Sequence, residues 1–372
     1  MRVKLEDVCV KGTSNLKQSD VIDKNGEYPI YGAAGYIRSV DFYHQDQPYV
    51  AVVKDGAGIG RTSLHPAKSS VIGTMQYLLP KKNILPEYLC YVVRYMHLEK
   101  YFTGATIPHI YFKDYKNEDF NLDTLDRQRE IVDILGKTEG IIASRQKELQ
   151  KLDDLIKARF VEMFGDPDVN SKGWNECALS EKLNVVGGYA FKSDQFDEER
   201  GIPVLRIGNI NAGFFRPVNL VYWHEDESLE RYIVYPGELV MSLTGTVGKD
   251  DYGNVCILGD DYGKNYLNQR NAKLEIVEGI DKYYLSQLLK FEQIKKRLTG
   301  ISRGVRQANI SNKDILNLVV PVPPMEIQEQ FSAFVAQTDK SKFQKYNATI
   351  LSHNIYVFET RRRFICKPTL II

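Results

Sequence analysis

The sequence predicts an α+β protein in which two β-rich domains are each followed by a long coiled-coil helix, and three observations support this. The 372-residue chain repeats itself in two collinear halves. A heptad pattern of apolar residues follows the first half. Short strand candidates bounded by turn residues, such as Pro48–Val53 and Gly237–Ser242, fill the regions between. We therefore expect an internal duplication.

The repeat matches residues of the first half with residues of the second half in the same order. One offset covers the matches from Tyr88 to Gly104, and a slightly larger one covers those from Lys113 on, because the second half has an insertion around Ser302 to Ala308. The period is too long for a solenoid, so it indicates a duplicated domain with its helix. The matches include Tyr88 with Tyr284, Leu89 with Leu285, Lys100 with Lys296, Lys113 with Lys313 and Gln128 with Gln328.

A heptad seam predicts the helix that ends the first half. Its positions alternate spacings of four and three residues, which is the signature of a coiled coil. The segment MFGDP at 163–167 ends the pattern, because glycine favours the turn after a helix and proline does not continue one. The apolar seam residues are Ile131, Leu135, Ile142, Leu149, Leu152 and Ile156, and Thr138 and Arg145 occupy the two remaining seam positions.

The second long helix follows Pro323-Pro324. Phe331 and Phe334 keep the seam, but the pattern degrades beyond Ser341, and we expect the last dozen residues to be irregular. The expected boundaries are 1–122 for the first β-rich domain, 123–164 for the first helix, 165–322 for the second β-rich domain, and 323–372 for the second helix and its irregular tail.

Composition narrows the class of protein. With 43% hydrophobic and 26% charged residues, the chain resembles soluble globular proteins. Its five cysteines are scattered singly, so we expect neither disulfides nor structural zinc. No apolar run has the length of a membrane span, and the first residues lack the apolar core of a signal peptide. We expect a cytoplasmic protein without a membrane partner.

The sequence lacks motifs for catalysis. The glycine-rich run Gly56–Arg61 lacks the Lys-Ser/Thr ending of a phosphate-binding loop. The six histidines show no metal-binding spacing, and no G-x-S-x-G elbow is present. The Pro-Pro pair opens a helix and does not complete the Asn/Asp/Ser-Pro-Pro-aromatic motif expected of an adenine methyltransferase. We therefore expect no enzyme activity, no metal and no cofactor.

Polar and basic side chains gather in segments suited to DNA. Arginine pairs bidentately with guanine, and asparagine or glutamine with adenine, while lysine and arginine hold phosphates. Such residues serve more often as hydrogen-bonded turn residues, but Arg303 and Arg306 lie in an insertion of one copy only, as expected if each copy reads a different sequence. The candidate DNA-binding residues are Lys54, Arg61, His109, Lys113, Arg206, Asn209, Asn211, Lys249, Gln269, Arg270, Arg303, Arg306, Gln307 and Asn309.

Several segments resemble the specificity subunits of type I restriction–modification systems. Segments GGYAFKS at 187–193 and GIPVLRIGNI at 201–210 are similar to the opening of a target recognition domain in that family. Segment TGATIPHI at 103–110 resembles a recurrent Gly-Ala-Thr-x-Pro-Asn-Ile segment, with His109 where asparagine is usual. The other resemblances are YPIYG at 28–32, DGAGIG at 55–60, MFGDP at 163–167 and PPMEIQ at 323–328.

The resemblance covers nearly the whole chain, in the order domain, helix, domain, helix. It implies that the two helices pair antiparallel and hold apart two target recognition domains, each reading half of a bipartite site in double-stranded DNA. It also implies that the helices dock two methyltransferase subunits and that restriction subunits join the larger complex. S-adenosylmethionine and ATP would then belong to those partners.

Two other functions stay open at the level of sequence. A coiled-coil scaffold that binds only protein fits the formal net charge of +1, because DNA binding relies on basic residues. The divergent Arg- and Asn-rich segments oppose this alternative. A stand-alone methyltransferase or nuclease has no motif in its support.

Overall fold

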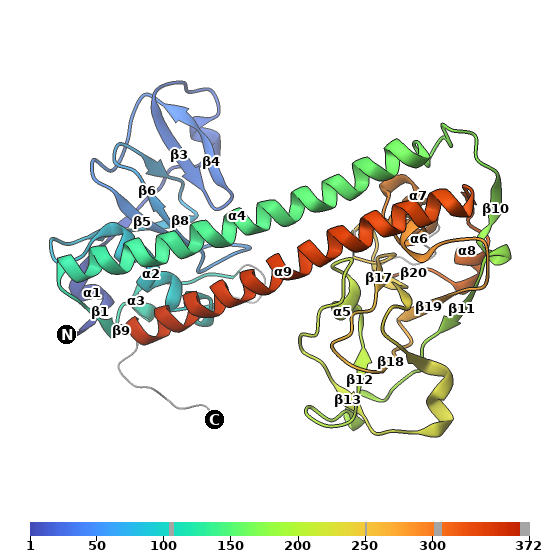
Figure 1. Ribbon diagram of the computed structural model, residues 1–372. Coiled ribbons are helices and arrows are strands. Elements are labelled where there is room, and N and C mark those ends of the chain that lie inside the picture. The colour runs from blue at the N-terminus through green and yellow to red at the C-terminus, as the bar shows by residue number, and fades with distance from the viewer. Residues whose placement is uncertain (104–107, 250, 301–306, 365–372) are drawn as a thin grey trace. The chain divides into compact units, whose positions relative to one another are not determined.

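The computed structural model describes residues 1–103, 108–249, 251–300 and 307–364 (Figure 1). The chain divides into two compact units. Unit 1 comprises Met1–Lys147 and Lys345–Ile372, and unit 2 comprises Glu148–Gln344. Each unit combines a β-rich domain with parts of both long helices.

The centre of unit 1 is a four-stranded antiparallel sheet in the order β2-β8-β5-β6. Strand β5 reads Tyr-Val-Ala-Val-Val and is buried along its whole length, as expected for a central strand covered on both faces. A second sheet has the order β4-β3-β7, in which β3 pairs antiparallel with β4 and parallel with β7. The strands of unit 1 are β1 (Arg2–Lys4), β2 (Cys9–Thr13), β3 (Tyr28–Gly32), β4 (Gly35–Val40), β5 (Tyr49–Val53), β6 (Thr62–His65), β7 (Ser70–Val71), β8 (Met75–Pro80) and β9 (Asp119–Asn121).

Helix α2 packs on this sheet and supplies much of the apolar core of unit 1. Pro86 opens α2, where its missing NH costs no hydrogen bond, and the residues from Tyr88 to Val93 are buried. The helical elements of the domain are α1 (Leu5–Val8), α2 (Pro86–Tyr95) and α3 (Phe112–Tyr115), with 3₁₀ turns η1 (Gln18–Val21) and η2 (Leu98–Tyr101).

The sheets of unit 2 follow the same pairing scheme. The antiparallel sheet β11-β19-β15-β17 corresponds to β2-β8-β5-β6, and β12 pairs antiparallel with β13 and parallel with β18. The strands are β10 (Glu176–Ala178), β11 (Leu183–Gly187), β12 (Ile202–Leu205), β13 (Tyr222–Trp223), β14 (Ile233–Val234), β15 (Leu239–Ser242), β16 (Thr244–Thr246), β17 (Val255–Ile257), β18 (Asn265–Leu267), β19 (Asn271–Ile276), β20 (Gln307–Asn309) and β21 (Val319–Pro321).

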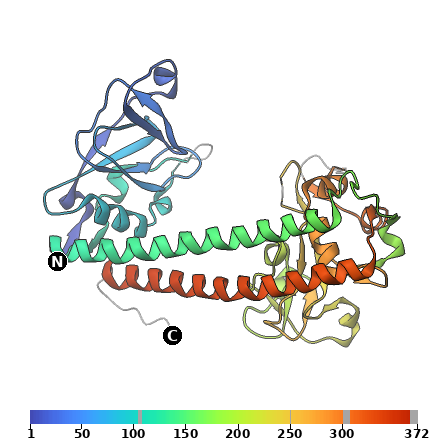
Figure 2. The same cartoon turned by 45° about the horizontal axis from the view of Figure 1, so that its top comes forward.

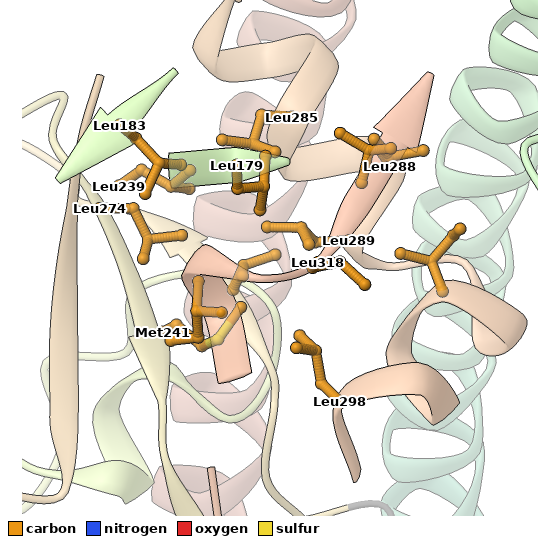
Figure 3. Packing of buried hydrophobic residues seen from close by; sticks show 14 of the residues in the cluster. Leu179, Leu183, Leu239, Met241, Leu274, Leu285, Leu288, Leu289, Leu298 and Leu318 are labelled. Atoms are coloured by element: carbon orange, nitrogen blue, oxygen red, sulfur yellow. The ribbon is translucent and has the colours of Figure 1, made fainter. Parts of the chain in front are cut away.

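A leucine-rich core joins the sheet of unit 2 to its short helices, as Figure 3 shows. Leu239 and Leu274 project from the sheet toward Leu285 and Leu288 of α6. The helical elements are α5 (Ile207–Ile210), α6 (Lys282–Leu289), α7 (Glu292–Thr299) and α8 (Asn312–Leu316), with 3₁₀ turns η3 (Leu179–Glu181), η4 (Ser193–Gln195) and η5 (Glu227–Tyr232).

The long helices α4 (Leu125–Phe164) and α9 (Met325–Phe364) have 40 residues each. Gly165 ends α4 in the left-handed region, with φ of 79°, as the MFGDP segment predicts. In unit 1 the two helices lie side by side and antiparallel (Figures 1 and 2): Tyr356 donates to Glu139, and Arg145 donates to Ser352.

The parts of α4 and α9 that belong to unit 2 are also antiparallel. Lys342 forms an ion pair with Asp153 at 2.7 Å. Further along α4, the Arg159 guanidinium lies 6.0 Å from the ring centre of Phe334. The residue number rises along α4 as it falls along α9, so the helix directions are opposed here too.

The predicted seam divides into two kinds of position. Ile131 and Leu135 are fully buried in the core of unit 1, and Ile156 and Phe331 are buried in the core of unit 2. The remaining seam residues are half-buried: Ile142, Leu149, Leu152 and Phe334. The ends of the helices therefore pack into the domains as core elements, and the stretches between them are less buried.

The prediction of an irregular tail is wrong for residues 361–364. Helix α9 continues to Phe364, which is 2% exposed and packs its ring edgewise against Tyr88 at 5.4 Å between ring centres. The heptad pattern fades because this end of α9 packs on the domain of unit 1, whose contacts do not follow a seven-residue period. Residues 365–372 lie outside the described residues.

Candidate nucleic-acid interface

In unit 1, the loop after β5 joins the segment that leads into α3. The backbone NH of Ile110 donates to the Lys54 carbonyl at 2.9 Å, and that of Gly56 donates to the Pro108 carbonyl at 3.0 Å. Gly58 has φ of 93°, and a Cβ there would lie 2.2 Å from the Arg61 Nε atom. The positive φ favours glycine at this position of the turn.

The side chains of this region form a connected group. His109 Nδ1 and Asp55 Oδ1 are 2.6 Å apart. His109 also stacks on Tyr111, whose ring centre lies 5.4 Å from the Lys113 ammonium. Arg61 is exposed and donates to the carbonyls of its own turn, and Lys54 lies 3.8 Å from Asp55. The four residues predicted in the first half therefore lie in one region.

In unit 2, backbone hydrogen bonds bring together the segments that carry Arg270, Asn309 and, after β16, Lys249. The NH of Leu243 donates to the Arg270 carbonyl at 2.8 Å, and the NH of Ile310 donates to the Leu243 carbonyl at 2.9 Å. Strand β20 pairs with β16, placing Asn309 opposite Thr244. The exposed side chains of this region include Lys249, Gln269, Arg270 and Asn309.

The turn that carries Lys249 is held by Asp251. The backbone NH of Thr246 donates to Asp251 Oδ1 at 2.7 Å, and the Thr246 hydroxyl donates to Oδ2 at 2.9 Å. The backbone donor in particular holds the pKa of the Asp251 carboxyl below its ordinary value. The turn is thus built around a stable carboxylate, with the Lys249 side chain in solvent.

Asn209 is a correction to the sequence prediction. It is 2% exposed, its Oδ1 accepts from the Arg206 NH at 2.9 Å, and its Nδ2 donates to the carbonyls of Arg216 and Val218, each at 3.0 Å. A buried amide with both atoms satisfied has no free edge for a base. Asn209 instead holds the loop that follows α5.

The other predicted residues near α5, Arg206 and Asn211, use part of their hydrogen-bonding capacity within the fold. Arg206 is half-buried and donates to the Asn219 carbonyl. Asn211 is half-buried too, donates to the Asp251 carbonyl at 2.6 Å, and so ties its segment to the Lys249 turn. Arg303 and Arg306 lie outside the described residues. Gln307 lies on β20 opposite Thr246, and its side chain also lies outside them.

Equivalent contacts within each unit show which residues of the two regions correspond to one another. Ile110 and Ile310 donate to corresponding loop carbonyls, which aligns His109 with Asn309. The Tyr88 hydroxyl donates to the Asn121 carbonyl at 2.9 Å, and the Tyr284 hydroxyl donates to the Pro321 carbonyl at 2.7 Å. The two units thus share the same backbone arrangement but present different side chains, His109 in unit 1 and Asn309 in unit 2.

Sequence reasoning missed Asp55 and Tyr111. Asp55 lies far from His109 along the chain, so only the fold brings the two together. For Tyr111 a signal was available, because it stands two residues from both His109 and Lys113.

Among the described residues, neither a reactive cysteine nor a metal site is found. Burial raises the pKa of the Cys9 and Cys256 thiols to about 12, so neither is a thiolate nucleophile at neutral pH. Within the part of the chain that the structure describes, no three His, Cys, Asp or Glu side chains group as metal ligands. The same part contains no helix with the length and apolarity of a membrane span.

A family model for the type I restriction modification DNA specificity domain matches residues 1–154 and 171–351. The chain belongs to this family. It is 26% identical over 314 residues to the type I restriction enzyme MjaVIII specificity subunit of Methanocaldococcus jannaschii, covering 78% of this chain and 72% of that protein. It is also 25% identical over 177 residues to the EcoBI specificity subunit of Escherichia coli, covering 45% of this chain and 34% of that protein.

The fold is that of a solved specificity subunit. The type I restriction–modification S subunit from M. genitalium superposes with a TM-score of 0.59 at 15% identity, covering 99% of this chain and 96% of that chain. Family membership makes this chain a specificity subunit, the non-catalytic DNA-recognition component of a restriction–modification complex. The prediction from the sequence is confirmed at that level.

Proposed function

We propose that unit 1 and unit 2 each read one half of a bipartite target in double-stranded DNA, and that the two units arose by duplication. The observation that carries this proposal is the shared frame with different exposed side chains, His109 in unit 1 and Asn309 in unit 2. Two copies of one fold that present different hydrogen-bonding groups are suited to two different base sequences.

Within each region, the side chains divide by chemistry. Lysines bind phosphates and set the position of the domain, while groups with paired donors and acceptors read base edges in the major groove. We assign Lys54, Arg61, Lys113 and Lys249 to phosphates, and His109, Gln269, Arg270 and Asn309 to bases. Arg206, Asn211, Arg303, Arg306 and Gln307 remain candidates for either role.

The net charge of the whole chain favours a shared grip on the DNA. A formal charge of +1 is low for a protein that binds DNA alone, since phosphate contacts supply most non-specific affinity. The partner subunits therefore provide part of the phosphate contacts. We place the working complex in the cytoplasm, with two methyltransferase subunits and with restriction subunits joining them.

The outer side of α4 is the proposed docking surface for the methyltransferase subunits. Ile134 and Ile141 are exposed in unit 1, by 38% and 47%. In unit 2, Leu155 and Val161 of the same helix are exposed by 49% and 41%. Ile134 and Ile141 stand seven residues apart, close to two helical turns, so they lie on the same side of α4 and are both in contact with water. The buried seam residues pack in the cores of their own units and so are not part of this proposed surface.

The test is methylation-site sequencing of DNA modified by the complex of this chain with its methyltransferase. Each variant, Arg270→Ala in unit 2 and His109→Ala in unit 1, should relax the sequence of one half of the motif and leave the other half unchanged. An uninterrupted motif, or relaxation of both halves by one substitution, would contradict separate reading. DNA retention by the purified chain without its partners should fall with salt, whereas a protein-only scaffold would show no retention.

A further inference from the structure

The residue before α3 differs in kind from its counterpart in unit 2. Tyr111 occupies the N-cap position, and within the described chain no side chain caps α3. Ser311 occupies the same position before α8: its hydroxyl accepts from the backbone NH of Asp314, and the Asp314 carboxylate accepts from the backbone NH of Ser311. Unit 2 thus has a capping box where unit 1 has an aromatic ring.

The two positions are equivalent by backbone and by core. Ile110 and Ile310, one residue earlier, make corresponding hydrogen bonds to the neighbouring loop. Four residues after each N-cap, Tyr115 and Ile315 are both fully buried. Asp114 is present in unit 1 where Asp314 completes the box in unit 2. Unit 1 has no capping hydroxyl at this position, although serine is among the best N-cap residues and tyrosine is not.

The ring of Tyr111 gains little burial in exchange, because Tyr111 is 50% exposed. It is held from two sides along the chain: His109 lies at 6.4 Å between ring centres with 23° between planes, and the Lys113 ammonium lies 5.4 Å from its centre. A position that breaks a local rule without a gain in packing is a candidate for a role outside the fold, and the exposed ring of Tyr111 occupies such a position.

The neighbouring histidine has a defined orientation. A carboxylate only accepts, so the 2.6 Å contact with Asp55 places a hydrogen on His109 Nδ1. Nε2 lies on the opposite side of the imidazole, and the described residues make no hydrogen bond to it. A base edge beside Tyr111 would thus meet an aromatic ring and a fixed imidazole nitrogen.

We propose that Tyr111 is a specificity-determining residue of unit 1 whose ring contacts the C5-methyl group of a thymine. Thymine is the one base that presents an apolar group in the major groove. In this arrangement His109 Nε2 hydrogen-bonds a neighbouring base, and Lys113 binds a phosphate. The inference rests on the proposed reading of a half-site by unit 1 and names the chemistry of that reading.

The experiment compares Tyr111→Ser with Tyr111→Phe in the complex with the methyltransferase. Tyr111→Ser recreates the capping box of unit 2, so the expected result is a higher Tm together with loss of discrimination at one thymine position of one half-site. Tyr111→Phe keeps the ring and should keep the motif. Arg270→Ala, which alters the other half-site, shows which half belongs to unit 1.

A second readout uses a synthetic duplex of the wild-type motif in which that thymine is replaced by uracil. Loss of one buried methyl group should weaken binding about fourfold for the wild type and for Tyr111→Phe. Binding by Tyr111→Ser should not change. An unchanged motif in Tyr111→Ser, a Phe variant that behaves like Ser, or equal affinity of the wild type for both duplexes would overturn the inference. None of these results affects the proposed function, which fails if the wild type has no split motif.

Discussion

Gln328, near the start of α9, accepts a hydrogen bond on Oε1 from the backbone NH of Asp281 at 2.8 Å. Asp281 is the N-cap of α6, so a side chain of the long helix fixes the start of a domain helix. Gln128 of α4 makes the same bond at 2.8 Å to Leu85, the N-cap of α2. Both glutamines are fully buried, and each joins a long helix to the domain of its own unit.

Replacing either glutamine should destabilise the unit that contains it. Gln328→Leu leaves the Asp281 NH and the Pro323 carbonyl without their partner, which costs about 1–3 kcal/mol for each buried group. Limited proteolysis should then cut unit 2 faster, and Gln128→Leu should do the same for unit 1. Gln330→Leu, at an exposed position of α9, is the control and should behave like the wild type.

Base reading predicts selective loss of specificity. Arg270 is exposed beside β20, and a good bidentate contact to guanine is worth about 1–3 kcal/mol of discrimination. Arg270→Ala should therefore relax one position in one half of the methylated motif. Lys249→Ala is the matched comparison from the same region: it should weaken binding to all sequences alike and lower the salt dependence. Uniform weakening by Arg270→Ala would reassign that residue to phosphate binding.

The docking surface predicts a loss of assembly without a loss of folding. Ile141 is 47% exposed on α4, and a glutamate there would bury a charge in an apolar interface. Ile141→Glu should reduce co-purification of the methyltransferase while the Tm of the isolated chain stays the same. Gln146→Glu adds the same charge at another exposed position and measures the effect of charge alone. Full assembly with Ile141→Glu would place the interface elsewhere.

His65 predicts that unit 1 loses stability in mild acid. It is 5% exposed, stacks on Tyr49 and packs at a tilt against Tyr31, and burial lowers its pKa to about 4. Between its ordinary pKa near 6.5 and about 4, the unfolded chain binds a proton that the folded chain does not. Stability is therefore complete above about pH 6.5 and falls by up to about 3 kcal/mol as the pH drops toward 4.

Denaturant unfolding at pH 7 and pH 5 checks this prediction, with His224→Gln at an exposed position as the control. The wild type and the control should lose stability equally between the two pH values. His65→Asn should show a smaller difference between them. An equal difference in all three proteins would assign the acid sensitivity to other groups.

The parts of the fold that sequence predicts are those with local signals. The spacing from Ile131 to Ile156 is visible within one helix, and the MFGDP segment marks where α4 ends. The match of Gln128 with Gln328 also holds in the structure, because each makes the same contact with its own domain. Such patterns need no knowledge of distant residues.

The parts that sequence does not predict depend on distant contacts. Phe364 continues α9 because Tyr88 and Tyr95 lie beside it, and no heptad pattern contains that information. Asn209 has the composition of a base-reading residue, but its carbonyl partners come from the loop that follows it. The contact of Asp55 with His109 likewise exists only once the loop after β5 meets the segment before α3.

Methylome sequencing of a host with and without this gene tests the central claim most directly. The account predicts that one methylated motif disappears with the gene and that the motif is split into two specified halves around unspecified bases. Restoring the gene with Arg270→Ala should return the motif with a single half relaxed. Loss of no motif, or of one uninterrupted motif, would contradict the claim that the two units each read their own half-site.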